Sequence, residues 1–113
     1  MNLETKESRT PHDAIIVRDC MVPMRDGVLL ATDIYRPAAG SDPLDGAFPT
    51  LLIRTPYDKC SPNSVEKHGL YYARRGYVVV IQDCRGRYAS EGEFYFLAQE
   101  AEDGYDTIVW VGE

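Results

Sequence analysis

The sequence predicts an α/β domain with a mixed, mostly parallel sheet, and three observations lead to this fold class. Two short runs, 50–53 and 77–81, are almost continuously apolar, which is typical of strands covered on both faces. The segment between them, 63–75, can form a helix, so the three segments make a β-α-β unit. An Asp-Gly pair at 26–27 separates two extended runs and predicts an antiparallel hairpin ahead of that unit.

The hairpin is predicted from residues 14–22 and 28–35. The first segment is rich in isoleucine and valine, and the second alternates so that Asp33 and Tyr35 share one side of the sheet. Residues 37–49 contain three prolines, two glycines and two aspartates, a composition that predicts a surface loop.

The β-α-β unit carries its own boundary signals. Pro56 ends the strand at 50–54, because a proline disfavours the helical region at the residue before it. Asn63 is expected to cap the helix, and Gly76 suits the position just beyond its end. A strand at 77–82 then completes the unit.

A second helix is predicted after a long loop that runs from residue 83 to about 96. Its apolar residues recur at helical spacing as far as Val111, and its acidic residues lie on the opposite side, so we expect an amphipathic helix leading into a further parallel strand. The apolar stripe is Leu97, Ala101, Tyr105 and Ile108, and the acidic side is Glu102, Asp103 and Asp106.

Composition narrows the class of protein. The chain has 113 residues, which we divide into a flexible lead-in at 1–13 and one domain, or part of one, at 14–113. A net charge of −6 argues against a nucleic-acid partner. No apolar run reaches the ~20 residues that span a bilayer, and the polar N-terminus is no secretory signal, so no membrane partner and a cytoplasmic location are expected.

Cysteine and histidine usage argues against a disulfide framework or a metal site. The three cysteines, Cys20, Cys60 and Cys84, are widely spaced and form no C-x-x-C pair, so we expect reduced thiols. With only two histidines in the chain, no metal ligand set is expected.

Two polar loops, 54–59 and 82–92, directly follow the two apolar runs. Ligands in open α/β sheets bind at loops that leave the carboxyl ends of strands, so a site is predicted where these loops meet. Tyr57, in the first loop, can donate its phenol O–H to a developing oxyanion or can simply cap the loop by hydrogen bonding. In the second loop an anion site or an internal ion-pair network can be built from Asp83, Arg85 and Arg87.

A nucleophile is harder to find. Serine hydrolysis needs a nucleophile, a base, a group that orients the base, and oxyanion donors, but no serine of the chain lies in G-x-S-x-G. Ser90 comes nearest, although Tyr88 takes the place of one glycine. Cys84 departs in the same way and is expected to be a small buried hydrophobe. His12 and His68 are expected to be ordinary surface residues.

Four segments occur in a recognisable order: MRDGVLLATDIYRP, PTLLIRTPYDK, ARRGYVVVIQDCRGRYASEGEF and EAEDGYDTIVWV. Over roughly residues 15–111 they resemble the N-terminal part of the cocaine-esterase-like hydrolases. This group includes Xaa-Pro dipeptidyl-peptidases, glutaryl-cephalosporin acylases and α-amino acid ester hydrolases.

The resemblance implies the N-terminal part of an α/β-hydrolase fold, ending before the nucleophile elbow. It further implies cleavage of a small-molecule ester or amide by a Ser-His-Asp triad without a cofactor. In full-length members a helical cap and a C-terminal jelly roll follow. Tyr57 matches the tyrosine whose hydroxyl completes the oxyanion hole. Because the triad is not in this chain, we expect the 113 residues alone to be inactive.

Two other functions remain open. The chain can be a stand-alone, non-catalytic domain that binds a partner, because the strand at 50–54 would lie at an open sheet edge by the family's strand order, and such an edge also favours self-association. A thiol enzyme that uses Cys84 is the third reading.

Overall fold

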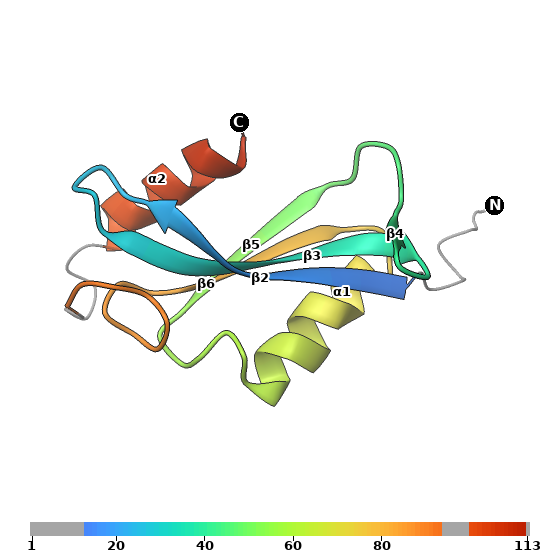
Figure 1. Cartoon of the computed structure of the whole chain (residues 1–113), viewed down its shortest axis with the longest axis horizontal. Coiled ribbons are helices and arrows are strands. Elements are labelled where there is room, and N and C mark those ends of the chain that lie inside the picture. Colours follow the sequence, from blue (N-terminus) through green and yellow to red (C-terminus); the bar gives the residue numbers. More distant parts are fainter. Residues whose placement is uncertain (1–12, 94–99, 113) are drawn as a thin grey trace.

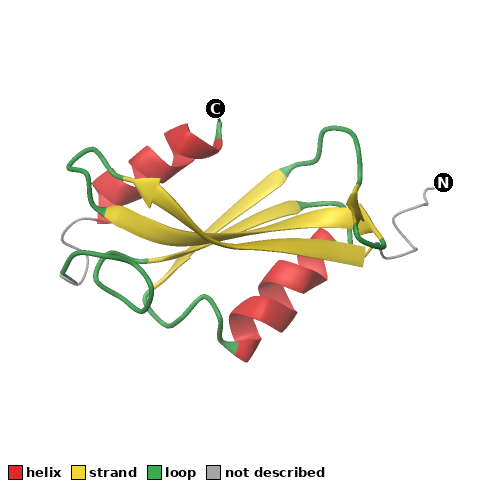
Figure 2. Cartoon of the chain, viewed as in Figure 1, coloured by secondary structure: helices red, strands yellow, loops and turns green. Residues whose placement is uncertain are grey.

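The computed structural model describes residues 13–93 and 100–112 and shows one twisted sheet with a helix on each face (Figures 1 and 2). The predicted lead-in lies outside the described residues except for Asp13, which begins the first strand. The elements are β2 (Asp13–Pro23), β3 (Leu29–Ala39), β4 (Asp42–Pro43), β5 (Thr50–Thr55), η2 (Asn63–Leu70), α1 (Tyr71–Ala73), β6 (Val78–Asp83) and α2 (Glu100–Val111).

The predicted mixed sheet is confirmed, with strand order β2-β3-β6-β5 and β4 paired to β3. Its predicted mostly parallel character is not found among the described residues: β5 and β6 form the one parallel pair, and the other three pairs, which all include β3, are antiparallel. The predicted hairpin is β2–β3. Its turn is closed by the Gly27 N–H, which donates to the Met24 carbonyl at 2.9 Å, and Gly27 has the positive φ of 88° that this turn requires.

The surface loop predicted at 37–49 is only partly correct. β3 continues through Pro37 and Ala38, which are both buried, and β4 pairs with the last two residues of β3. The Pro37 carbonyl accepts from the Leu44 N–H, on the side away from β2. A residue's N–H and C=O point to the same side of a strand, so the missing N–H of this proline removes no hydrogen bond to β2.

The first helix consists of η2, a π-helical segment, and α1, which continues it. The predicted Asn63 cap is wrong: the Ser61 hydroxyl accepts from the Ser64 N–H at 3.2 Å instead, and Asn63 is already helical. The predicted end is present, because Gly76 has φ 94° and the Tyr77 N–H reaches back to the Tyr72 carbonyl in a Schellman arrangement. This helix covers the sheet face that carries the buried side chains of Tyr35, Val79 and Ile81, against which Ala73 of α1 packs.

The second helix, α2, covers the opposite face of the sheet, but the side of the helix that faces the sheet is not the predicted one. Asp103 and Thr107 are buried, whereas Tyr105 and Ile108 are 62% and 61% exposed. The predicted apolar stripe therefore faces outward, and Leu97 lies outside the described residues. The reason is that the buried positions find polar partners beneath the helix, as the site below shows.

Candidate functional site

The loops after β5 and β6 meet at the carboxyl ends of these parallel strands, as the sequence predicted. The Cys84 N–H donates to the Thr55 carbonyl at 3.0 Å, and Arg87 Nε donates to the Pro56 carbonyl at 3.0 Å. Adjacent parallel strands end at the same edge of a sheet, so the polar residues that follow each strand come together.

Asp83 joins the two loops. Its Oδ1 accepts from the Lys59 N–H at 2.8 Å, and its Oδ2 accepts from the Ala89 N–H at 3.3 Å. Burial raises the pKa of this carboxyl above its ordinary value. Asp83 thus fixes the backbone of both loops and does not form an anion site with the neighbouring arginines.

Tyr57 projects from the first loop and its side chain is 73% exposed. The backbone around it is fixed: its own N–H donates to Thr55 Oγ1 at 2.9 Å, and Asp58 follows with φ 83°. A side chain held out from an anchored backbone can donate to a group bound outside the sheet. The oxyanion role of Tyr57 stays a prediction.

Lys59 is a buried charged residue of this loop that the sequence analysis did not single out. Its ammonium is buried and pairs with Asp19 Oδ1 at 2.7 Å and Asp33 Oδ1 at 3.0 Å. Burial acts to lower the pKa of Lys59, but the hydrogen bonds with Asp19 and Asp33 outweigh burial and raise it above its ordinary value. A lysine in a polar loop gives no sequence signal of such burial.

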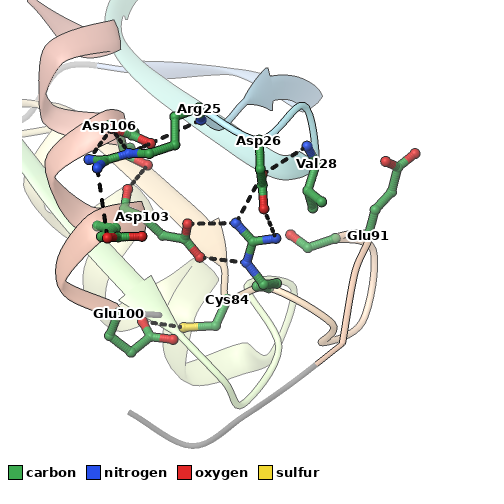
Figure 3. A network of polar contacts seen from close by, with 12 residues as sticks. Arg25, Asp26, Val28, Cys84, Glu91, Glu100, Asp103 and Asp106 are labelled. Atoms are coloured by element: carbon green, nitrogen blue, oxygen red, sulfur yellow. Dashed lines mark hydrogen bonds and ion pairs between the residues drawn. The ribbon is translucent and has the colours of Figure 1, made fainter. Parts of the chain in front are cut away.

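Arg85 belongs to an internal ion-pair network, which is one of the two readings that the sequence left open (Figure 3). Its Nε and Nη2 donate to Asp103 of α2 at 2.9 and 2.8 Å, and its Nη1 donates to Asp26 of the hairpin turn at 2.9 Å. Nearby, Arg25 binds Asp106 at 2.8 Å. The network fastens α2 to the β2–β3 turn and explains why Asp103 and Asp106 of α2 turn inward, while Glu102 stays exposed.

Ser90 has a structural role. Its hydroxyl donates to the Asp83 carbonyl at 2.6 Å and accepts from the Ala31 N–H at 2.8 Å, so its hydrogen bonds tie the second loop to β3. Cys84 is buried, and burial raises the pKa of its thiol to about 12, which argues against a thiolate nucleophile. Ser90 and Cys84 came nearest to a nucleophile motif among the described residues, and their surroundings argue against that role for both.

The remaining candidates give no catalytic arrangement. His68 Nε2 lies 3.3 Å from the Asn63 amide, and His12 falls outside the described residues. In the ranges 13–93 and 100–112, no three His, Cys, Asp or Glu side chains are grouped so that they could hold a metal ion. No helix among these residues has the length and apolar character needed to cross a membrane.

The fold and the two loops agree with comparisons to known proteins. The chain is 46% identical over 101 residues to cocaine esterase of Rhodococcus sp. (strain MB1 Bresler), a match that covers 87% of this chain and 17% of that protein. Among solved structures, an α-amino acid ester hydrolase is 31% identical with a TM-score of 0.62, covering 98% of this chain and 20% of its own. A CocE/NonD family hydrolase of Staphylococcus aureus is 27% identical with a TM-score of 0.67, covering 86% of this chain and 20% of its own.

Brefeldin A esterase, at 20% identity and a TM-score of 0.64, shares the fold alone, which is that of the α/β-hydrolases. The chain spans about a fifth or less of the length of the cocaine esterase, ester hydrolase and CocE/NonD relatives. The sequence profile of the X-Pro dipeptidyl-peptidase (S15) family matches residues 26–113. With this match over most of its length and with these relatives, the chain belongs to the X-Pro dipeptidyl-peptidase (S15) family of hydrolases.

Proposed function

We propose that this chain supplies the oxyanion donor of a serine hydrolase that cleaves ester or amide bonds through an acyl-enzyme. The observation that carries the proposal is the placement of Tyr57, exposed on a loop that is anchored on both sides at the carboxyl end of β5. Family membership supports hydrolysis as the class of reaction.

In the proposed reaction a serine hydroxyl attacks the carbonyl carbon of the substrate while a histidine takes the hydroxyl proton. The carbonyl oxygen becomes negatively charged in the tetrahedral intermediate, and the Tyr57 O–H donates a hydrogen bond to it. The backbone N–H after the nucleophile gives the second donor. The leaving group departs with the proton from histidine, and water then releases the acyl group by the reverse sequence.

We further propose that the 113 residues alone do not turn over substrate. The hydroxyls of Ser61 and Ser64 bond to one another and Ser90 is held by backbone groups, so these serines are committed to the fold. The triad would come from a polypeptide region other than this one.

The unpaired state of the three cysteines supports a cytoplasmic location.

The test begins with sequencing of the gene and transcript beyond codon 113, where a G-x-S-x-G motif is expected in the open frame. In the polypeptide so defined, Tyr57→Phe is expected to lower kcat for p-nitrophenyl acetate by roughly 10²–10³-fold, the usual cost of losing one oxyanion donor. Tyr105→Phe, at an exposed tyrosine of α2, is the matched control and should leave kcat unchanged. Equal kcat values for the two variants would reject the role of Tyr57.

A second candidate, a non-catalytic domain that binds a partner through its open edge, is favoured by one observation. Among the described residues β5 stands last in the sheet order and pairs only with β6. An unpaired strand edge is a template for another chain. This function predicts a stable, monodisperse 113-residue chain, and sedimentation velocity would separate it from the first.

A further inference from the structure

Lys59, two residues after Tyr57, is held at both of its ends. Its backbone N–H donates to Asp83 at the end of β6, at 2.8 Å. Its ammonium reaches Asp33 of β3 at 3.0 Å and Asp19 of β2 at 2.7 Å. A single loop residue is therefore bound to three strands of the sheet.

A β-bulge in β2 makes this arrangement possible. The register of β2 against β3 shifts around Asp19, whose φ is 53°. The bulge turns the Asp19 N–H toward Asp33 Oδ1, at 2.9 Å, and leaves the Asp19 carboxylate for Lys59. Arg18, the other bulge residue, donates to Asp33 Oδ2 at 3.0 Å. Bulges occur next to active sites, where they redirect side chains.

Stability alone is a weak reason for the buried pair of Lys59 and Asp33. Replacing a buried ion pair by well-packed apolar residues of similar volume is often neutral or stabilising. What the ion pair adds is a fixed geometry, because hydrogen bonds to the carboxylates of both Asp33 and Asp19 restrict the Lys59 ammonium to one position. The exposed Tyr57 side chain, next to this anchor, is the group that needs a fixed position.

We propose that Lys59 is a positioning residue, which holds the Tyr57 loop against the β2 bulge so that the Tyr57 hydroxyl meets the oxyanion. This inference rests on the proposed function of Tyr57 and adds the residues that act through it. Misplacement of a catalytic group by about 1 Å can cost on the order of 100-fold in rate, so loss of the anchor is expected to lower kcat by roughly 10–100-fold while KM changes little.

The experiment uses the polypeptide assayed above and four variants of it. Lys59→Met removes the anchor but leaves Asp33 without its ammonium partner, and it can fail to fold for that reason. The double variant Lys59→Met/Asp33→Asn removes both charges and keeps the test valid. Lys67→Met, at an exposed lysine of η2, is the matched control. Lys59→Arg, which keeps the charge, should recover part of kcat.

Two measurements decide the outcome. If Lys59 acts through Tyr57, the double variant should lower kcat when Tyr57 is present but have little further effect when Tyr57 is already replaced by phenylalanine. Amide hydrogen exchange at Asp58–Ser61 should also be faster in the double variant than in Lys67→Met. Additive losses of kcat, or unchanged exchange, would overturn the positioning role. If Tyr57→Phe alone leaves kcat unchanged, the proposed function fails, and amide exchange by itself then decides whether Lys59 orders this loop.

Discussion

Cys84 and Cys60 follow neighbouring parallel strands, yet their thiols lie in opposite environments. Cys84 is buried with its Sγ 3.5 Å from Glu100 Oε1, and burial raises its pKa to about 12. Cys60 is exposed. Only a thiolate is alkylated quickly, so iodoacetamide at pH 8 is expected to modify Cys60 in the native chain and to leave Cys84 unmodified until denaturant is added.

Peptide mass spectrometry after timed alkylation measures both sites in one sample. At pH 8 a thiol with a pKa of about 12 is ionised in roughly one molecule in 10⁴, which sets the expected protection of Cys84. Rapid modification of Cys84 in the native chain would instead favour the hypothesis that this protein is a thiol enzyme.

At the scale of single residues, the sequence shows where polar side chains gather but not which of them are buried. The position of Tyr57 after an apolar run was enough to place it in a loop at the end of a strand. The burial of Lys59 was not predictable, because its partner Asp33 lies on a distant strand and the geometry depends on a bulge at Asp19. Local sequence patterns carry no information on either.

Gly69 in η2 shows why the first helix can approach the sheet closely. A Cβ built at this position would lie 2.3–2.7 Å from three ring atoms of Tyr35, whose side chain is fully buried. Neither the ring nor the helix can move without disturbing the core, so Gly69→Ala is expected to lower the free energy of unfolding by about 3 kcal/mol, the upper end of the usual cost of overpacking.

Gly104 of α2 is the matched control, because a Cβ there meets nothing within 4 Å. Gly104→Ala should raise the free energy of unfolding by about 0.5–1 kcal/mol, since alanine loses less backbone entropy in a helix than glycine. Urea denaturation of the two variants gives both values. A neutral effect of Gly69→Ala would mean that the helix is not packed against Tyr35.

At the scale of elements, the helices and all strands except β4 were predictable within a few residues, whereas the side that each helix turns toward the sheet was not. The hairpin and the parallel strands follow from Asp26-Gly27 and from continuous apolar runs. The orientation of α2 does not follow from its apolar stripe, because Asp103 and Thr107 are buried against Arg85 and Gln82. Specific polar pairs across the interface outweighed the amphipathic pattern.

At the scale of the whole molecule, the described sheet has an open boundary at β5 beside an apolar hollow. The hollow has a volume of about 200 Å³ and lies between the sheet and α2. Its lining residues are Ile34, Thr50, Val78, Val80, Trp110 and Val111. An open edge next to apolar side chains favours association, because a second strand would satisfy the backbone groups and cover the apolar surface together.

The direction of each backbone group on β5 identifies which residues face that open edge. The carbonyls of Pro49 and Thr55 accept from the N–H groups of Val78, in β6, and of Cys84, the residue after β6. Backbone groups alternate along a strand, so those of Leu51 and Ile53 also point toward β6. Leu52 lies between them and turns its N–H and C=O outward. A proline at position 52 therefore removes a donor from the open edge, whereas a proline at 53 removes one from the ladder to β6.

We expect the 113-residue chain to associate at concentrations of about 100 μM and the Leu52→Pro variant to be more monomeric. The variant should keep the far-ultraviolet circular dichroism of the parent, because edge strands tolerate proline where the N–H faces solvent. Ile53→Pro, the matched control, should lose structure, since it breaks the parallel pair that brings the Tyr57 loop to Asp83. Sedimentation velocity at several concentrations measures the shift.

If the parent chain is monomeric, β5 does not recruit a second copy. If Leu52→Pro associates as strongly as the parent, the contact lies elsewhere, and the exposed stripe of α2 around Tyr105 and Ile108 becomes the surface to test.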